Sequence, residues 1–373
     1  MDTNFNMNRN KKLTRVISFL FLLLTNTIAI TAQVKKQLSA AELKQWEVKQ
    51  GQENYLSKVP AAKKEKGEAL SRILLAYAVK HFLHEADATK YPLDENRNDI
   101  EKAVAAAISS LSPATKKKLS QQVIINLKNP IKTESLGKLK AVDFTKKSIN
   151  SEIERLMPGE SVKVFKKSDR IIAQAAGKPE IKMVDRVELA LRDILCVDQT
   201  NPEGGSNTND DMILSGILIG CSGNVKAIPS VLSCHFKDGG LCDHGNVKFG
   251  SFDMNSCAAF PKTFICVFKL VEADDDMQGV ANTMDDLMSM VASICAGLKE
   301  YHDAEEIAVS VAYTMDDLPG MFTNDADFFP SRIVFYTMQD RNSFGSDGHS
   351  DDMTTTNISG NGGVYRIGFS WRY

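Results

Sequence analysis

The stretch Asp210-Asp211-Met212-Ile213-Leu214-Ser215-Gly216-Ile217-Leu218-Ile219 decides the fold of this chain. From Met212 to Ile219 it is nearly all apolar, with no sign of the alternation that a half-exposed strand shows. A short apolar run bounded by polar residues is typical of a strand that is buried on both faces. This stretch therefore predicts an interior strand of a β-rich domain.

Further stretches with the character of strands lie on both sides of it. Val187, Leu189 and Leu191 alternate with charged residues, as in a strand with one solvated face. More strands are predicted at 231–236, 247–254, 263–273, 307–313, 331–338 and 364–373. Turns rich in Gly, Asn, Asp and Pro separate them, and one helical pattern, residues 283–300, interrupts them. We expect an antiparallel β-sandwich-like domain with one inserted helix.

The residues before this domain have helical periodicity instead. Helices are predicted over 61–85, from Asp99, from Ser112-Pro113 to about residue 127, and over 144–157. Ser112 followed by Pro113 is a cap with a first-turn proline. The predicted fold class is α+β, with a small N-terminal helical region followed by the β-sandwich-like domain.

The charges divide the chain at the same place. Residues 34–180 carry 28 Lys and Arg against 18 Asp and Glu, whereas residues 181–373 carry 13 against 28. We therefore predict a basic helical region, 33–180, and an acidic β-rich domain, 181–373. The lysines are not interleaved with aromatic residues, so a solvated helix surface is expected and a nucleic-acid partner is not. If the two halves pack together, their contact should weaken with salt.

The first 32 residues have the pattern of a cleaved signal peptide. Basic residues precede an apolar run from Val16 to Leu24, and Ala32 offers a cleavage site before Gln33. The run is too short to span a bilayer, so stable membrane insertion of the mature chain is not expected. The first cysteine is Cys196, far from the cleavage site, so a lipid-anchored start is not expected. A secreted or periplasmic protein is predicted, with either Met1 or Met7 as initiator.

Acidic loops give the first candidate site. The acidic half contains 22 Asp and only 6 Glu, and Asp favours turns and cation-binding loops. The candidate ligands of a calcium ion are carboxylates next to predicted strands: Asp198, Asp210, Asp211, Asp274, Asp275 and Asp276. The alternative is that these residues only form solvated turns.

All seven cysteines fall between Cys196 and Cys295, where an exported protein can form disulfides. Cys234 and Cys242 flank a Gly-rich turn and are the first candidates for a disulfide, followed by Cys257 with Cys266. The remaining cysteines, with Cys266, sit in apolar segments that suit a buried thiol. Histidines beside Cys234 and Cys242 also suggest a zinc site as a hypothesis, although their spacing matches no standard zinc site.

Two smaller patterns are interpreted as structural. The pentapeptide Thr-Met-Asp-Asp-Leu occurs at 283–287 and again at 314–318. We interpret Thr283 as the cap of a helix and expect Pro319 to prevent a helix after the second copy. His81, His84 and Glu85 lie on one predicted helix, and in its lysine-rich context they indicate a helix surface rather than a metal site.

Residues 186–295 resemble an uncharacterised bacterial β-domain with acidic loops. The resemblance is carried by residues 210–216, 236–240 and 272–276. It implies a β-domain with acidic loops and no particular activity. No sequence motif of a nucleophilic serine, a phosphate-binding loop, a dinucleotide site or a zinc protease occurs, and neither catalytic nor cofactor-binding residues are assigned.

The sequence therefore favours a non-catalytic binding or effector module for an unknown protein or glycan partner, and calcium stabilisation of its acidic loops is a further hypothesis. Two alternatives stay open. One is a secreted hydrolase that uses loop carboxylates. The other is an outer-membrane-associated β-barrel protein, because residues 365–373 alternate aromatic or apolar residues with polar residues and glycine. A terminal strand that closes the sandwich is the preferred interpretation of that last segment.

Overall fold

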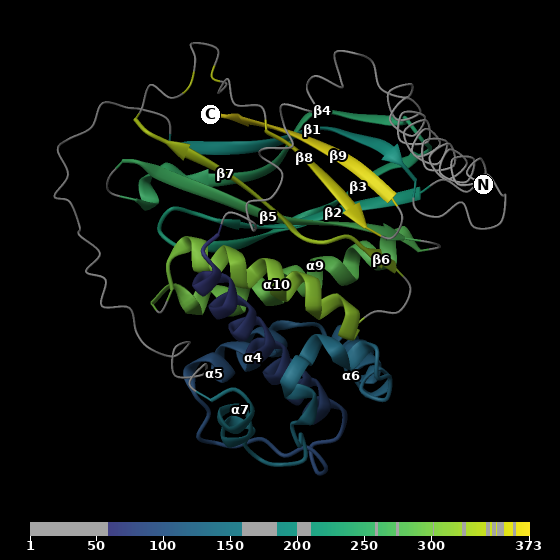
Figure 1. Ribbon diagram of the computed structural model, residues 1–373, viewed down its shortest axis with the longest axis vertical. Coiled ribbons are helices and arrows are strands. Elements are labelled where there is room, and N and C mark those ends of the chain that lie inside the picture. The colour runs from purple at the N-terminus through teal and green to yellow at the C-terminus, as the bar shows by residue number, and fades with distance from the viewer. Residues whose placement is uncertain are drawn as a thin grey trace, which may run out of the picture. The chain divides into compact units, whose positions relative to one another are not determined.

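The computed structural model describes residues 59–158, 185–199, 210–257, 260–273, 276–300, 302–322, 326–340, 344, 348, 354–360 and 363–373. Two antiparallel sheets stack on one another, and helices cover the outer face of one of them (Figure 1). The predicted α+β class, with helices before a sandwich-like pair of sheets, is confirmed.

The first sheet, sheet A, has the strand order β4-β1-β9-β8. Its strands are β1 (Arg186–Asp198), β4 (Leu241–Asp253), β8 (Thr354–Gly360) and β9 (Gly363–Arg372). The last strand of the chain thus lies inside the sheet, between β1 and β8. Its alternating Tyr365, Ile367, Phe369 and Trp371 side chains are buried in the sandwich, as expected for a strand that closes it.

The second sheet, sheet B, has the order β3-β2-β5-β6, and β7 also pairs with β5. Its strands are β2 (Asp210–Ile219), β3 (Val225–Phe236), β5 (Lys262–Ala273), β6 (Ala326–Phe328) and β7 (Arg332–Met338). The short β6 pairs with the end of β5 and β7 pairs with its beginning, so the two strands share one edge of β5.

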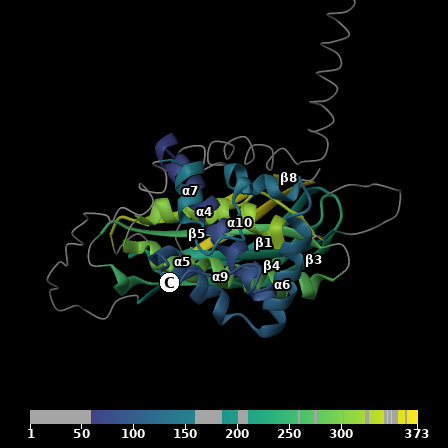
Figure 2. The same ribbon diagram turned by 90° about the horizontal axis from the view of Figure 1, so that it is seen from below.

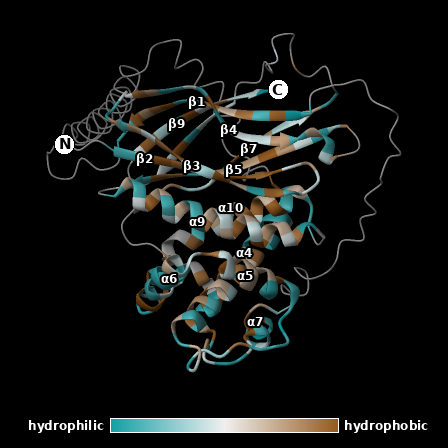
Figure 3. Ribbon diagram, turned by 180° about the vertical axis from the view of Figure 1, so that it is seen from behind, coloured by the Kyte–Doolittle hydropathy of each residue, from teal (hydrophilic) through white to brown (hydrophobic). Residues whose placement is uncertain are grey.

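Strand β2 is buried on both faces, as its sequence predicts. Met212, Leu214 and Leu218 face the core between the two sheets, whereas Ile213 and Ile217 belong to a second core on the other side of sheet B. Because successive side chains of a strand point to opposite faces, an unbroken apolar strand requires two cores. Figure 3 shows hydrophobic residues concentrated in the sheets and in the helices that cover sheet B.

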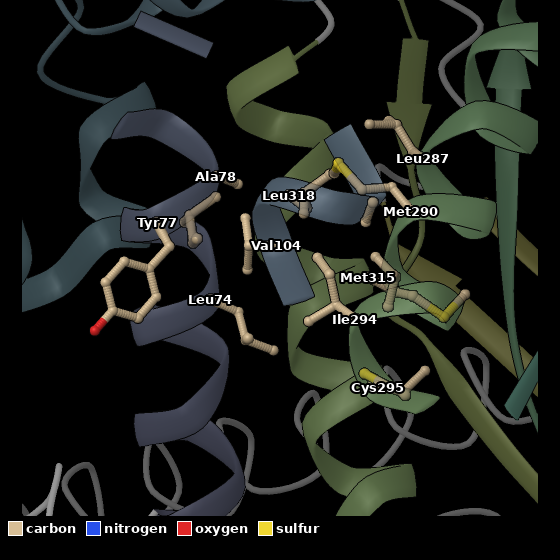
Figure 4. Close-up of a cluster of buried hydrophobic side chains, with 14 of the residues drawn as sticks. Leu74, Tyr77, Ala78, Val104, Leu287, Met290, Ile294, Cys295, Met315 and Leu318 are labelled. Carbon is tan, nitrogen blue, oxygen red and sulfur yellow. The ribbon is translucent and has the colours of Figure 1, made fainter. Parts of the chain in front are cut away.

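The second core lies between sheet B and two layers of helices. Helices α9 and α10 pack directly on the sheet, and α4 to α7 lie beyond them (Figures 1 and 2). The helices are α4 (Ala61–Ala86), α5 (Asp99–Ser110), α6 (Pro113–Asn126), α7 (Asn150–Leu156), α9 (Met277–Ala296) and α10 (Ala304–Phe322); the short 3₁₀ segments are η2 (Lys132–Ala141), η3 (Met254–Ser256) and η4 (Gly297–Glu300). Figure 4 shows Leu74 of α4, Val104 of α5, Ile294 of α9 and Met315 of α10 in one cluster. The described residues belong to one compact unit.

One predicted strand is wrong. Residues 307–313 belong to helix α10, which lies between sheet B and α4 and is therefore buried on nearly every side. A mostly apolar run with β-branched residues looks the same in a buried helix as in a buried strand. The signal that distinguishes them is a capping box: Glu306 N–H donates to the Asp303 carboxylate at 2.8 Å, and Asp303 N–H donates to Glu306 at 3.4 Å.

The expected caps around the repeated pentapeptide are also wrong. Helix α9 begins at Met277, with Asp276 as its N-cap, so Thr283 lies well inside the helix. Helix α10 continues through Pro319 to Phe322. Both pentapeptides are therefore in the bodies of helices.

The oppositely charged halves meet at the start of α10. Lys63 Nζ lies 2.6 Å from a Glu305 oxygen, and Lys66 Nζ lies 3.1 Å from a Glu306 oxygen. The predicted boundary near residue 180 falls within 159–184, outside the described residues, and stays a prediction. The predicted signal peptide also lies outside them. None of the helices in the described ranges is both long and apolar enough to cross a bilayer.

Candidate functional site

Three of the predicted calcium ligands lie at one end of the sandwich. Asp198 ends β1, and Asp210 and Asp211 begin β2. The turn between β3 and β4 packs onto this end, because Gly239 N–H donates to the Cys196 carbonyl at 3.0 Å. We call this region, residues 196–199, 210–211 and 236–240, the acidic end.

Asp198 and Asp238 form the outer part of the acidic end. The backbone N–H of Gln199 donates to Asp238 Oδ1 at 2.8 Å, and the Gln199 side chain donates to the Phe236 carbonyl at 2.9 Å. Burial raises the pKa of the Asp198 carboxyl, and the negative charge of Asp238 raises this pKa further. A cation between these groups would remove that repulsion.

Asp210 and Asp211 point in different directions. Asp210 is 5% exposed and accepts a hydrogen bond from the Tyr365 hydroxyl, whereas Asp211 contacts His235 on the outside of the sheet. Burial is also the main reason why the pKa of the nearby Cys196 thiol is raised to about 12. This thiol therefore stays protonated at neutral pH and has little nucleophilic character.

Asp276 has a structural role as the N-cap of α9. Its carboxylate accepts the Gly279 N–H at 2.9 Å. Asp274 and Asp275, and residues 200–209, lie outside the described residues. Within the described residues, no three His, Cys, Asp or Glu side chains are grouped so that they could hold a metal ion. The calcium site stays a prediction.

The disulfide between Cys234 and Cys242 is present, with its Cα atoms 5.8 Å apart. It joins β3 of sheet B to β4 of sheet A, and its sulfurs are therefore not available to zinc as thiolates.

The expected disulfide between Cys257 and Cys266 is wrong. Cys257 pairs instead with Cys221, and their Cα atoms are 6.0 Å apart. Cys266 lies in β5, is a free thiol and faces the core between the two sheets. Cys221 precedes β3 and Cys257 follows β4, so the two disulfides close opposite ends of the β3–β4 edge. Cys196, Cys266 and Cys295 are buried thiols, as expected, whereas the same expectation is wrong for Cys221, which is in a disulfide.

A serine and a histidine meet at this edge, which the sequence did not indicate. Ser233 Oγ of β3 lies 3.2 Å from His244 Nε2 of β4. Burial lowers the pKa of His244, which favours the neutral imidazole that can accept a proton. The two residues are eleven positions apart and become neighbours because the turn at 237–240 brings the start of β4 back beside the end of β3, where Cys234 and Cys242 also meet.

A buried pair of titratable groups lies in the helical layers. His81 Nε2 of α4 and Glu101 Oε1 of α5 are 3.8 Å apart, and both side chains are at most 5% exposed. Burial raises the pKa of Glu101 to about 7, and burial lowers the pKa of His81 to about 4, with a further decrease from the charge of Arg97. The expected helix surface is thus wrong for His81, because α5 packs over it, while Glu85 is exposed as expected.

The first aspartate of each pentapeptide binds a strand of sheet B. Asp285 of α9 accepts the Ser230 N–H of β3 at 2.6 Å. Asp316 of α10 accepts the Ser331 N–H, just before β7, at 2.7 Å. These strands lie on opposite sides of the central pair β2 and β5, so the two helices attach to sheet B in equivalent ways.

The second aspartate of each pentapeptide binds the outer helices. Asp286 accepts the Thr115 hydroxyl of α6 at 2.8 Å, and Asp317 accepts the Ser71 hydroxyl of α4 at 3.3 Å. Each copy therefore joins the sheet on one side to the outer helical layer on the other. The two copies of the pentapeptide therefore make the same kind of contacts between layers, and neither copy caps a helix.

The fold defines an α+β protein in which a β-sandwich with two disulfides rests on two layers of helices. Comparison of the chain with protein-family models, with curated proteins and with solved structures finds no match.

Proposed function

We propose that the chain is an exported binding protein whose recognition surface is the acidic end of the β-sandwich, with calcium as the ion that stabilises its loops. The observation that carries this proposal is the pairing of Asp198 with Asp238, at the same end of the two stacked sheets where Asp210 and Asp211 begin β2. Calcium is bound by six to eight oxygens from flexible acidic loops, and loops at the end of a rigid sandwich are a common place for recognition.

Two further observations support the exported state. The sequence begins with a signal-peptide pattern, and the two disulfides fit an oxidising compartment. An unknown protein or glycan is the partner that this proposal requires.

The test is thermal unfolding of the mature chain in EDTA and in millimolar calcium, with magnesium as the control ion. An ion at about 100 times its dissociation constant stabilises a folded protein by about 2.7 kcal/mol. We expect a calcium-specific rise in Tm that is lost in the double variant Asp198→Asn/Asp238→Asn.

The matched control is Asp253→Asn, which changes a carboxylate at the opposite end of the β1–β4 pair. This variant should keep the full response to calcium. A wild-type Tm that is the same in EDTA and calcium would remove calcium from the proposal, and an equal loss in both variants would remove the acidic end as its location.

A hydrolase is the second candidate, and the pairing of Asp198 with Asp238 favours it. Two neighbouring carboxylates, one with a raised pKa, are what general acid catalysis uses. Turnover of chromogenic glycosides or esters that disappears in Asp198→Asn, without a change in Tm, would favour this candidate over the binding protein.

A further inference from the structure

A strongly basic surface lies on the outer helices. Residues 113–147, which comprise α6, the turn after it, η2 and the segment that follows, contain nine Lys against one Glu and one Asp. We call this stretch the lysine pole. Its net charge of +7 accounts for most of the +10 carried by residues 34–180. Helix α6 is on the side of α9 and α10 that faces away from sheet B (Figure 1).

Two exposed isoleucines lie among these lysines. Ile131 is 78% exposed, the largest value for any large hydrophobic side chain in the described ranges, and Ile125 is 55% exposed. On helix α6 and its continuation, Lys117, Ile125 and Lys128 fall on one stripe, because eight and then three residues separate them. Ile131 follows in the turn after α6, within three residues of Lys128.

This combination fits a lipid surface. Peripheral helices bind bilayers by placing aliphatic side chains at the boundary of headgroups and acyl chains while lysines contact anionic headgroups. The long lysine stem lets the ammonium group reach the phosphates while the neighbouring isoleucine inserts. Scattered exposed hydrophobic residues are normal on a protein surface, but here both exposed isoleucines lie within three residues of Lys128 in the most basic stretch of the described chain.

The composition of the lysine pole does not favour a nucleic acid or a protein as its partner. It contains no Arg, and its one aromatic residue, Phe144, is buried. Single-stranded nucleic acid is bound by aromatic stacking, and Arg is the usual donor to phosphates in nucleic acids. The cores of protein interfaces are poor in lysine. An anionic bilayer requires only the lysines and the aliphatic side chains that are present.

We propose that the lysine pole docks on a bilayer of anionic phospholipids, with Ile125 and Ile131 inserted at the interface. The sandwich, with its acidic end, belongs to other layers of the fold, so this function is independent of the proposed calcium site. Docking of this kind is peripheral and reversible, since no helix of the pole enters the bilayer as a span.

The experiment is co-sedimentation of the mature chain, from Gln33 with its disulfides formed, with vesicles of phosphatidylcholine alone or with about 30 mol% phosphatidylglycerol. We expect binding to the anionic vesicles only, and a loss of binding as NaCl rises from about 50 to 500 mM. Lys117→Ala/Lys128→Ala should bind about 25-fold more weakly, since each lysine near an anionic surface contributes about fivefold. Ile131→Ser should bind about tenfold more weakly at the same salt.

The matched controls lie on the sandwich. Leu241→Ser changes a side chain that is 60% exposed on β4, and Lys226→Ala changes an exposed lysine of β3. Both controls should bind anionic vesicles like the wild type. Because all these positions are exposed, circular dichroism should show the same fold in each variant.

Three results would overturn the proposal. One is equal binding to neutral and anionic vesicles. Another is an equal loss of binding in the pole variants and the controls. The third is tighter binding to a DNA or RNA oligonucleotide than to anionic vesicles that depends on Lys117 and Lys128 but not on Ile131, which would assign the pole to nucleic acid.

Discussion

The His81–Glu101 pair predicts opposite pH profiles for two single variants. Glu101 has a pKa of about 7 in the folded protein instead of 4.5. As the pH rises from 4.5 to 7, the unfolded carboxyl loses its proton while the folded one keeps it, so the free energy of unfolding falls. The interval is 7 − 4.5 = 2.5 pH units, and each unit corresponds to about 1.4 kcal/mol, giving a loss of about 3 kcal/mol.

His81 gives the opposite sign. Its pKa is about 4 in the folded protein instead of 6.5. As the pH falls from 6.5 to 4, the unfolded imidazole gains a proton that the buried imidazole does not take up, and the free energy of unfolding falls by a similar amount, about 3 kcal/mol. Between pH 4.5 and 6.5 the two effects cancel, because folded and unfolded chains each hold one proton on the pair.

The wild-type protein should therefore show no pH dependence from this pair between pH 4.5 and 6.5, whereas each single variant should reveal one slope. Glu101→Gln leaves His81, so the variant should lose stability as the pH falls. His81→Gln leaves Glu101, so this variant should lose stability as the pH rises. The shifts should survive these changes because burial is the main cause of each pKa shift.

The assay is urea unfolding at half-unit steps of pH, followed by circular dichroism. Glu85→Gln, an exposed change on the same helix, is the control and should follow the wild type. Profiles of the same sign in Glu101→Gln and His81→Gln would refute the assignment of a neutral His81 beside a protonated Glu101. Flat profiles in both variants would show that neither group is desolvated.

Three further predictions follow from contacts elsewhere in the fold. Cys234→Ser should lower the free energy of unfolding by about 2.5 kcal/mol, from a loop of eight residues closed by Cys242, and urea unfolding under non-reducing conditions measures it; wild-type stability would contradict the disulfide. Lys269→Met should cost about 2 kcal/mol in the same assay, because the buried ammonium group bonds Asp316 at 2.8 Å; a more stable variant would show that its desolvation outweighs the ion pair. Glu306→Gln should remove a loss of stability that the wild type shows between about pH 4.5 and 2, because hydrogen bonds lower the pKa of this carboxyl to about 2, and acid unfolding curves that coincide would exclude it.

Prediction from sequence succeeded where a pattern repeats along the chain. The helices that begin at Ala61, Asp99 and Pro113 are found within a residue or two of their predicted bounds, because their apolar positions recur at helical intervals and Ser112 is a cap. Strand β2 was predicted from its apolar run alone. Helix α10 was missed for the same physical reason: an element that is buried on all sides has no polar face to give it a period.

In the candidate sites too, contacts between residues that are close in the chain could be predicted and contacts between distant residues could not. The Cys234–Cys242 disulfide could be predicted because its residues are near each other in the chain, whereas the partner of Cys257 was missed because it is 36 residues away. The His81–Glu101 pair joins two helices, α4 and α5. Nothing in the local sequence identifies such partners, since their proximity depends on how sheets and helices stack.

The sequence by itself determined the class of fold, the order of the helices before the strands, the basic and acidic halves, and an interior strand with two apolar faces. These properties depend on local periodicity and on composition, which each segment carries independently of the others. Only the tertiary structure decided which layer covers each face of sheet B, how both pentapeptides join the sheet to the outer helices, and that two isoleucines stay exposed among the lysines of α6. The physical reason is that burial and contact are properties of pairs of distant segments, and stacking alone decides which side chains of a pair are removed from water.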